Sequence, residues 1–107
     1  MASFHLLPSG DEQFYFILKA PNGKIILTGE TYTSLAAAEK GILSVMDHSG
    51  SEQYFDRRIS TDGRFYFVLK SSNGEIIGTS EMYVSSGGRD NGIVSVKDNA
   101  VRAVIVR

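Results

Sequence analysis

The most regular pattern in the chain is a run of large apolar residues in Phe14–Lys19, which recurs in nearly the same form in Phe65–Lys70. Aromatic and β-branched residues in such runs predict β-strands. Side chains alternate between the two faces of a strand, and the lysines mark the wetter face. We therefore place the phenylalanines and leucines in the core. The residues predicted to line the open face are Tyr15, Ile17, Lys19, Tyr66, Val68 and Lys70.

An Asn-Gly pair follows each of these runs, at Asn22-Gly23 and at Asn73-Gly74. This dipeptide between two apolar segments is the strongest short-range signal for a β-hairpin. Pro21 cannot donate a hydrogen bond to a strand ladder, so it disfavours a two-residue turn. We therefore expect a three-residue loop, with a type I turn followed by a left-handed glycine in a bulge.

The loop length also sets the register of the first hairpin. The bulged loop pairs Leu18 with Ile26 and Phe16 with Thr28, whereas a two-residue turn would bury Ile25 and Leu27 instead. We favour the bulged register. The second hairpin has no proline to discriminate between the two.

The apolar residues after the first hairpin have the spacing of a helix. Ser34 is a good N-cap for a helix that runs to about Met46. An apolar face at helical spacing is formed by Leu35, Ala38, Ile42 and Val45.

The corresponding second helix is weaker in its sequence. It contains Gly87, Gly88 and Gly92, and each glycine costs about 1 kcal/mol relative to alanine. We expect this helix to begin late, near Arg89, or to be frayed. The segment from Ala100 to Val106 is predicted to be a strand.

The two sets of elements arise from an internal duplication. When the chain is shifted by 51 residues, Phe4–Ser49 aligns without a gap on Phe55–Ala100, and 21 of the 46 columns are identical. The middle segment aligns both with the end of the chain and with its beginning. It therefore closes the first repeat and opens the second, and no Pro- or Gly-rich linker separates the two.

This arrangement predicts an α+β fold. We expect two tandem β-β-β-α-β repeats that share one antiparallel sheet with exchanged terminal strands, with two helices on one face. A lone repeat of about 50 residues would have a marginal core. We therefore expect one domain over residues 1–107, with repeat 1 about 1–53 and repeat 2 about 54–107.

The repeated pattern Phe-Tyr-Phe-x-Leu-Lys-x-x-Asn-Gly-x-Ile-Ile, followed by Glu-x-Tyr and then Gly-Ile-x-Ser-Val, resembles the YegP-like family of small bacterial proteins. The resemblance covers nearly the whole chain. It implies tandem β-β-β-α-β units that form a single sheet and exchange their last strands, and it implies that single-repeat members dimerise. The family has no assigned activity, so the resemblance implies a fold and no mechanism.

Charge and composition exclude several classes of function. Eleven basic and twelve acidic residues leave a net charge of −1, without the excess positive charge of a typical nucleic-acid binder. No cysteine is present, so no disulfide, cysteine-based zinc site or thiol nucleophile is expected. No leader and no membrane-spanning segment is visible, and we expect a cytoplasmic protein.

Four motifs are candidates for catalysis or ligand binding, and for each we prefer the interpretation that its residues only support the fold. Glu30-x-Tyr32-x-Ser34 and its copy Glu81-x-Tyr83-x-Ser85 are read as a corner tyrosine, a helix cap and a glutamate that accepts from a backbone donor. His5 and His48 lack metal-ligand spacing. The Ser-Gly-rich stretch before Arg89 matches no phosphate-loop pattern. The aromatic strand after Gly63 has the wrong order for an RNA-recognition motif.

We therefore predict no enzyme activity, no catalytic residue, no metal site and no cofactor. The favoured function is that of a small non-catalytic binding module that acts through its open sheet face, with Tyr15, Lys19, Tyr66 and Lys70 as the interaction surface. The expected partner is an unidentified protein, and the expected state is a monomer, with self-association left open. The alternative is weak nucleic-acid binding through the second repeat, which holds all six arginines. A small-molecule site at the seam between the repeats is a third hypothesis.

Overall fold

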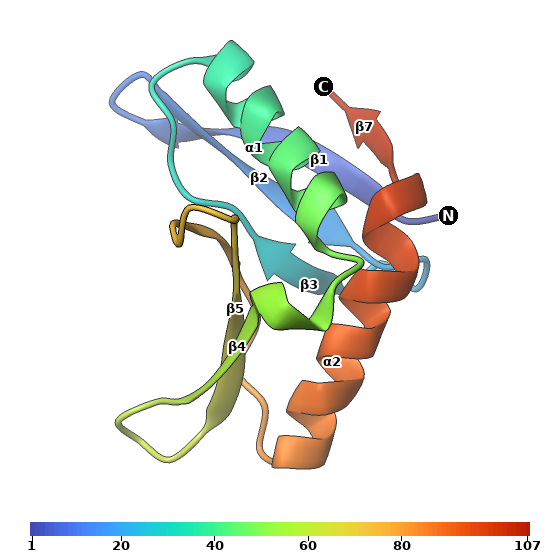
Figure 1. Cartoon of the computed structure of the whole chain (residues 1–107). Helices are drawn as coiled ribbons and strands as arrows, with labels where there is room; N and C mark the ends of the chain where they lie inside the picture. Colours follow the sequence, from blue (N-terminus) through green and yellow to red (C-terminus); the bar gives the residue numbers. More distant parts are fainter.

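The computed structural model describes all 107 residues, which form seven strands, two long helices and two short 3-10 turns (Figure 1). The strands are β1 (Ser3–Gly10), β2 (Gln13–Lys19), β3 (Ile25–Thr28), β4 (Phe55–Ile59), β5 (Phe65–Lys70), β6 (Ile76–Thr79) and β7 (Val104–Val106). The helices are α1 (Leu35–His48) and α2 (Ser86–Asn99), and the 3-10 turns are η1 (Glu52–Tyr54) and η2 (Ala100–Arg102). No helix is both long and apolar enough to cross a membrane.

All seven strands belong to one sheet in the order β4-β5-β6-β3-β2-β1-β7. The halves meet where β3 pairs with β6 at Thr28 and Thr79, which are equivalent positions of the two repeats. Strand β7 crosses from the second repeat to the edge of β1, whereas β4 pairs with β5 of its own repeat (Figure 1). The strand predicted over Ala100–Val106 begins only at Val104, because Ala100–Arg102 form η2. The predicted α+β fold with exchanged terminal strands is confirmed. All pairs are antiparallel except β1–β7, which is parallel.

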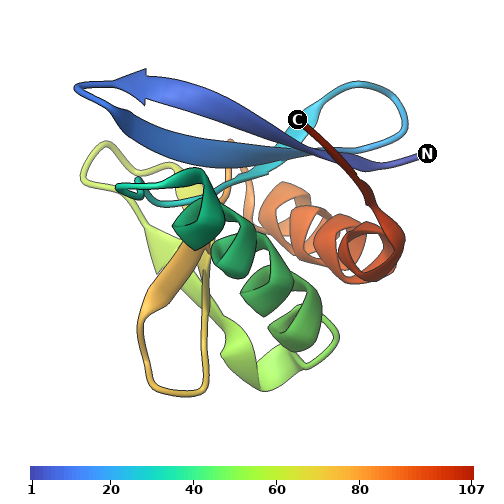
Figure 2. The same cartoon turned by 90° about the horizontal axis from the view of Figure 1, so that it is seen from above.

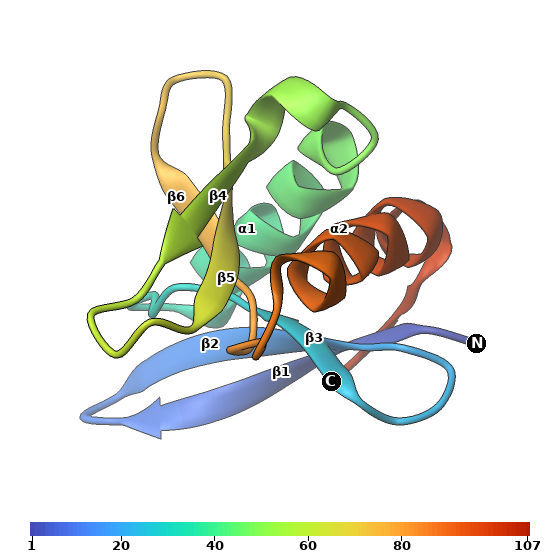
Figure 3. The ribbon, with the colours of Figure 1, turned by 90° about the horizontal axis from the view of Figure 1, so that it is seen from below.

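Both helices pack against one face of the sheet. Figure 2 shows α1 and α2 on the same side of β1 and β2, and Figure 3 shows the opposite side of these strands without a helix. The predicted open face therefore exists. The limits of the two repeats remain a prediction, but the sheet runs through both without interruption.

The first hairpin has the predicted loop but a shifted register. The Gly23 N–H donates to the Ala20 carbonyl oxygen at 2.9 Å, and Gly23 has φ of 85°, as a type I turn with a glycine bulge requires. Beyond the loop, however, Leu18 pairs with Leu27 and Ile17 with Thr28. Our predicted partners, one residue away, were wrong.

The physical reason is a second bulge at Ile26, between the pairs Lys19–Ile25 and Leu18–Leu27. A bulge sets two residues against one, so Ile26 and Leu27 both face the core, and both are buried. The second hairpin has the same irregularity, because Lys70 pairs with Ile76 and Leu69 with Gly78.

The first helix begins and packs as predicted. The Ser34 Oγ accepts from the Ala37 N–H at 3.0 Å and caps α1. Three residues of the predicted apolar face, Ala38, Ile42 and Val45, are buried, whereas Leu35 is exposed at the first turn.

The second helix is as long as the first, so the predicted late start near Arg89 was wrong. The Ser85 Oγ accepts from the Gly88 N–H at 3.0 Å, and α2 begins at Ser86. This cap and the burial of Ile93 and Val96 outweigh the low helix propensity of the glycines.

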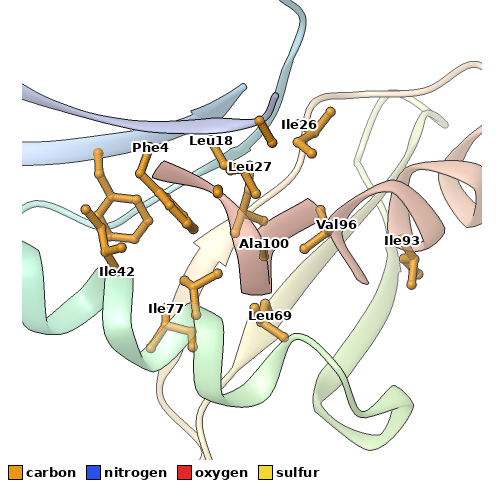
Figure 4. Packing of buried hydrophobic residues seen from close by; sticks show 14 of the residues in the cluster. Phe4, Leu18, Ile26, Leu27, Ile42, Leu69, Ile77, Ile93, Val96 and Ala100 are labelled. Carbon is orange, nitrogen blue, oxygen red and sulfur yellow. The ribbon is translucent and has the colours of Figure 1, made fainter. Parts of the chain in front are cut away.

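The core is one cluster to which both repeats contribute (Figure 4). Phe4 and Phe16 pack edge to face with ring centroids 5.9 Å apart, and their equivalents Phe55 and Phe67 do so at 5.7 Å. The symmetry breaks at the β3–β6 junction, because Leu27 fills the space beside Gly78, its equivalent in the second repeat. The two halves therefore interlock at this point.

Candidate functional site

The outer face of the sheet, the side away from the helices, carries the predicted interaction residues. Tyr15 lies opposite Leu7 and Lys19 opposite Ser3 in the β1–β2 pair. Tyr66 lies opposite Arg58 in the β4–β5 pair. All four predicted site residues are partly exposed: they are Tyr15, Lys19, Tyr66 and Lys70. They form two equivalent sets, one on each side of the Thr28–Thr79 junction.

Two residues that we placed on this face are not accessible. Ile17 is 8% exposed and Val68 only 2%. Ile17 lies between His5 and Thr28 in the middle of the sheet, and Val68 lies between Asp56 and Thr79. Side chains on the two flanking strands therefore cover each residue. The surface that a partner could touch consists of the flanking tyrosines and lysines.

The first half of the outer face is mostly uncharged. Strand β7 places Val104 beside Ser3 and Val106 beside His5, and both valines are exposed. Leu7 continues this surface next to Tyr15. The His5 Nε2 and the Ser3 Oγ form a 2.8 Å hydrogen bond across the same face. A partner would meet apolar and aromatic side chains here.

The second half of the outer face is charged. Arg58 lies 3.0 Å from Asp56, and the Lys70 Nζ lies 3.6 Å from the same carboxylate. Hydrogen bonds to Asp56 and Tyr66 raise the pKa of the Arg58 guanidinium. The equivalents of Asp56 and Arg58 in the first half are His5 and Leu7. The two halves therefore share a fold but differ in the chemistry that they present.

The Glu-x-Tyr-x-Ser motif has the structural role that we preferred, except at its glutamate. Tyr32 pairs with Phe14 through two backbone hydrogen bonds of 2.7 and 2.8 Å, and it stacks on Phe16. Its hydroxyl lies against Gly41, where a Cβ atom would collide with it, and Tyr83 does the same at Gly92. These contacts explain why both helices keep this glycine. Glu30 forms no hydrogen bond, so the predicted bond to a backbone donor is not formed.

These tyrosines predict a loss of stability at alkaline pH. Burial, followed by the negative charge of nearby glutamates, raises the pKa values of Tyr32 and Tyr83 above the ordinary 10.0. The unfolded chain therefore loses these protons first, so their contribution is complete below pH 10 and is lost as pH rises through the folded pKa values. Urea titrations between about pH 9 and pH 11 should show a smaller decline for Tyr32→Phe/Tyr83→Phe than for wild type. Equal declines would contradict the assignment.

His48 joins the two halves of the structure. Its Nδ1 donates to the Ser44 carbonyl oxygen at 2.7 Å, and its Nε2 accepts from the Ser72 N–H of the β5–β6 turn at 3.1 Å. The ring also packs edge to face on Tyr54, with centroids 4.7 Å apart. The structure contains no group of three His, Cys, Asp or Glu residues arranged to hold a metal ion.

The equivalent place in the other half is open. The residue equivalent to Ser72 is Pro21, which has no N–H to donate. The residue equivalent to His48 is Asn99, whose side-chain amide donates to the Ser95 carbonyl oxygen instead. A depression of about 280 Å³ lies here, lined by Met1, Ala2, Pro21, Asn99 and Arg102. It is the one cavity of the structure and lies at the seam between the repeats, where we expected any small-molecule site.

The arginines are largely neutralised within the chain. Five of the six form ion pairs with carboxylates, and Arg102 donates to the Asp98 carbonyl oxygen. The Cζ of Arg89, which follows the Ser-Gly-rich stretch, lies 5.3 Å from the centroid of the Phe65 ring, and its guanidinium pairs with Asp90. These pairs reduce the positive charge available to phosphates, on which nucleic-acid binding depends.

The fold and the paired motifs define a class of protein, the tandem duplication of a small α+β unit in which both repeats form one sheet and the last strand of the second repeat joins the first strand of the first. The chain belongs to the family described as a domain of unknown function (DUF1508), whose model matches residues 9–56 and again residues 60–106. The resemblance seen in the sequence is thereby confirmed.

Relatives and solved structures agree with this assignment. The chain is 48% identical over 102 residues to the UPF0339 protein YegP of Shigella flexneri, covering 95% of this chain and 93% of that protein. The solution NMR structure of yegP from E. coli matches with a TM-score of 0.91 at 46% identity, covering 97% of this chain and 90% of that one. A UPF0339 protein from Shewanella oneidensis also matches with a TM-score of 0.91, at 43% identity, covering 97% and 88%. The E. coli protein is described as one of unknown function.

Proposed function

We propose that the protein is a non-catalytic, cytoplasmic interaction module that binds a protein partner through the outer face of its sheet. The contact residues in this proposal are Tyr15, Lys19, Tyr66 and Lys70. The observation that carries the proposal is that both helices cover one face of the sheet and leave the other uncovered (Figure 3). This uncovered face carries partly exposed tyrosines and the exposed Val104 and Val106. Such patches often form protein contacts.

The two halves of this face would contact different parts of a partner. Leu7, Val104 and Val106 surround the first set and favour an apolar contact, whereas Asp56 and Arg58 surround the second set and favour a charged one. A tyrosine at the centre of each half combines a large apolar area with a hydroxyl, the combination found at energetically dominant interface positions. The proposed partner therefore has an apolar patch next to a polar one.

The test is recovery of a partner from a cell lysate with wild-type protein and with Tyr15→Ala/Tyr66→Ala. Truncating a dominant interface tyrosine costs on the order of 2 kcal/mol, about 30-fold in affinity. We expect the double variant to lose the partner band, and titration with the purified partner should show a loss of at least this size. Circular dichroism would verify that the variant is folded.

Leu43 and Val94 provide a matched control. They occupy equivalent positions of the two helices and are 53% and 52% exposed, so Leu43→Ala/Val94→Ala removes a similar pair on the opposite face. We expect this variant to bind like wild type. If it loses the partner and the tyrosine variant does not, the outer face is the wrong surface. Salt-dependent retention of wild type on a nucleic-acid column would instead favour the alternative function.

A further inference from the structure

The two ends of the sheet are not alike. The outer edge of β1 is covered by β7, and the Val104 N–H donates to the Ala2 carbonyl oxygen there at 3.1 Å. The equivalent strand of the second repeat, β4, is the last strand of the sheet and has no neighbour on its outer side. An unpaired edge strand is a template for pairing with another strand.

The hydrogen bonds of β5 show which groups of β4 are open. Phe65 and Phe67 direct their backbone groups away from β4, towards Tyr83 and Ser80. Because bonding directions alternate along a strand, Tyr66 and Val68 bond to β4 at Arg58 and Asp56. The N–H and C=O groups of Arg57 and Ile59 therefore point to the open edge. The Phe55 carbonyl oxygen does so too, while its N–H donates to the Glu52 carbonyl oxygen.

The sequence of this edge is complementary to itself when reversed. Around a centre at Arg57, the order is apolar, acidic, basic, basic, apolar. In an antiparallel pair of two such strands centred on Arg57, Asp56 faces Arg58 of the other copy, and Phe55 faces Ile59 of the other copy. The open backbone groups are then also in register. The N–H and C=O groups of Arg57 face those of Arg57 in the other copy, and the Ile59 N–H faces the Phe55 carbonyl oxygen of the other copy.

We propose that two copies of this protein associate through the outer edges of their β4 strands, in antiparallel orientation, to form one continuous sheet with two-fold symmetry. This edge shares Asp56 and Arg58 with the outer face proposed above, but its backbone contacts lie on the unpaired side of β4, at the end of the sheet. The first repeat has no such edge, because His5 and Leu7 replace the charged pair and β7 covers the strand. The two-fold axis makes each contact occur twice.

Arg57 lies on the proposed axis, where two like charges approach each other. Its guanidinium is neutralised within each copy by Asp90 at 3.0 Å and by Glu52 at 3.2 Å. Ile59 supplies the apolar contribution, because its side chain is 64% exposed in the single chain and would pack beside the partner copy's strand. Five residues of strand form a small interface, so we expect a dissociation constant on the order of 100 µM.

The test is sedimentation equilibrium from about 10 µM to 1 mM. We expect the average mass of the wild type to rise from 11.7 kDa towards twice that value. The variants Asp56→Arg and Arg58→Asp each place like charges opposite one another, so each is expected to remain monomeric alone. In an equimolar mixture of the two variants, the introduced arginine faces the introduced aspartate, and we expect association to return.

The mixture separates the proposal from simpler explanations. Neither a folding defect nor a lost intramolecular ion pair would be repaired by adding the other variant. Tyr15→Ala should dimerise like wild type, because Tyr15 lies on β2, away from the β4 edge. A wild type that stays monomeric at 1 mM, an Arg58→Asp variant that associates like wild type, or a mixture that stays monomeric would each overturn the proposal.

Discussion

Replacing Gly78 with leucine is expected to destabilise the protein by roughly 3 kcal/mol, the upper range for overpacking a filled core. Gly78 is buried at the β3–β6 junction. A Cβ atom there would lie 2.6 Å from the Leu27 Cδ2 and 2.7 Å from its Cγ, too close for real contacts. The change would force β3 and β6 apart, at the seam where the two halves of the sheet meet.

The reverse change is expected to be costly for the opposite reason. Leu27 is fully buried, so Leu27→Gly leaves a cavity and adds a flexible backbone position, together about 4 kcal/mol. The two positions are equivalent in the repeats and share one volume. The exchanged variant Leu27→Gly/Gly78→Leu should therefore be more stable than the sum of the two single changes by at least about 1 kcal/mol.

Urea unfolding of the wild type, the two single variants and the exchanged variant measures this coupling directly. A positive coupling means that the junction accommodates one leucine from either side. If the two changes add without coupling, Leu27 and Gly78 do not compete for the same space, and the explanation given for the broken symmetry is wrong.

A chain restricted to Met1–Gly50 is expected to lose all cooperative folding as a monomer, which is the largest effect considered. It would keep β1, β2, β3 and α1, but it would lack β7 on one edge and β6 on the other. Half of the buried core residues belong to the second repeat, among them Leu69, Ile77 and Val96. About 50 residues without these partners cannot offset the entropy of folding.

Thermal unfolding followed by circular dichroism, with the oligomeric state measured by sedimentation, tests this expectation. The full chain is the control and should melt in one cooperative transition. A fragment that folds only as a dimer would agree with a core that two repeats must share. A monomeric fragment with a cooperative transition would show that the repeat is a complete unit, against the shared core described here.

The elements of the fold could be predicted because local signals are strong. The Asn-Gly loops, the Ser34 cap and the alternation of Phe14–Lys19 each depend on residues close in sequence. The register beyond Ile26 could not be predicted in this way, because the bulge there lets two consecutive residues reach a core that other strands help to form. The full length of α2 could not be predicted for the same reason, because the packing of Ile93 and Val96 against the core outweighs the low helix propensity of three glycines.

The candidate site was predicted in outline and corrected in detail. Alternation placed Tyr15 and Tyr66 on the outer face, where the structure has them. It also placed Ile17 and Val68 there as accessible residues, although neighbours on the two flanking strands cover each of them. The apolar contribution of Val104 and Val106 was missed, because nothing in the sequence indicates which strand β7 will join.

Sequence comparison within the chain was sufficient to establish the duplication and the order of the main elements, since these follow from repeated short patterns. Which strand β7 joins was decided only by the tertiary structure. The contacts between the two halves were determined only by the tertiary structure. Which of Leu27 and Gly78 fills the junction, how His48 reaches Ser72, and why β4 is left without a neighbour depend on residues far apart in the chain. Packing and strand pairing act on residues that are neighbours in space, and an alternation pattern records only neighbours along the backbone.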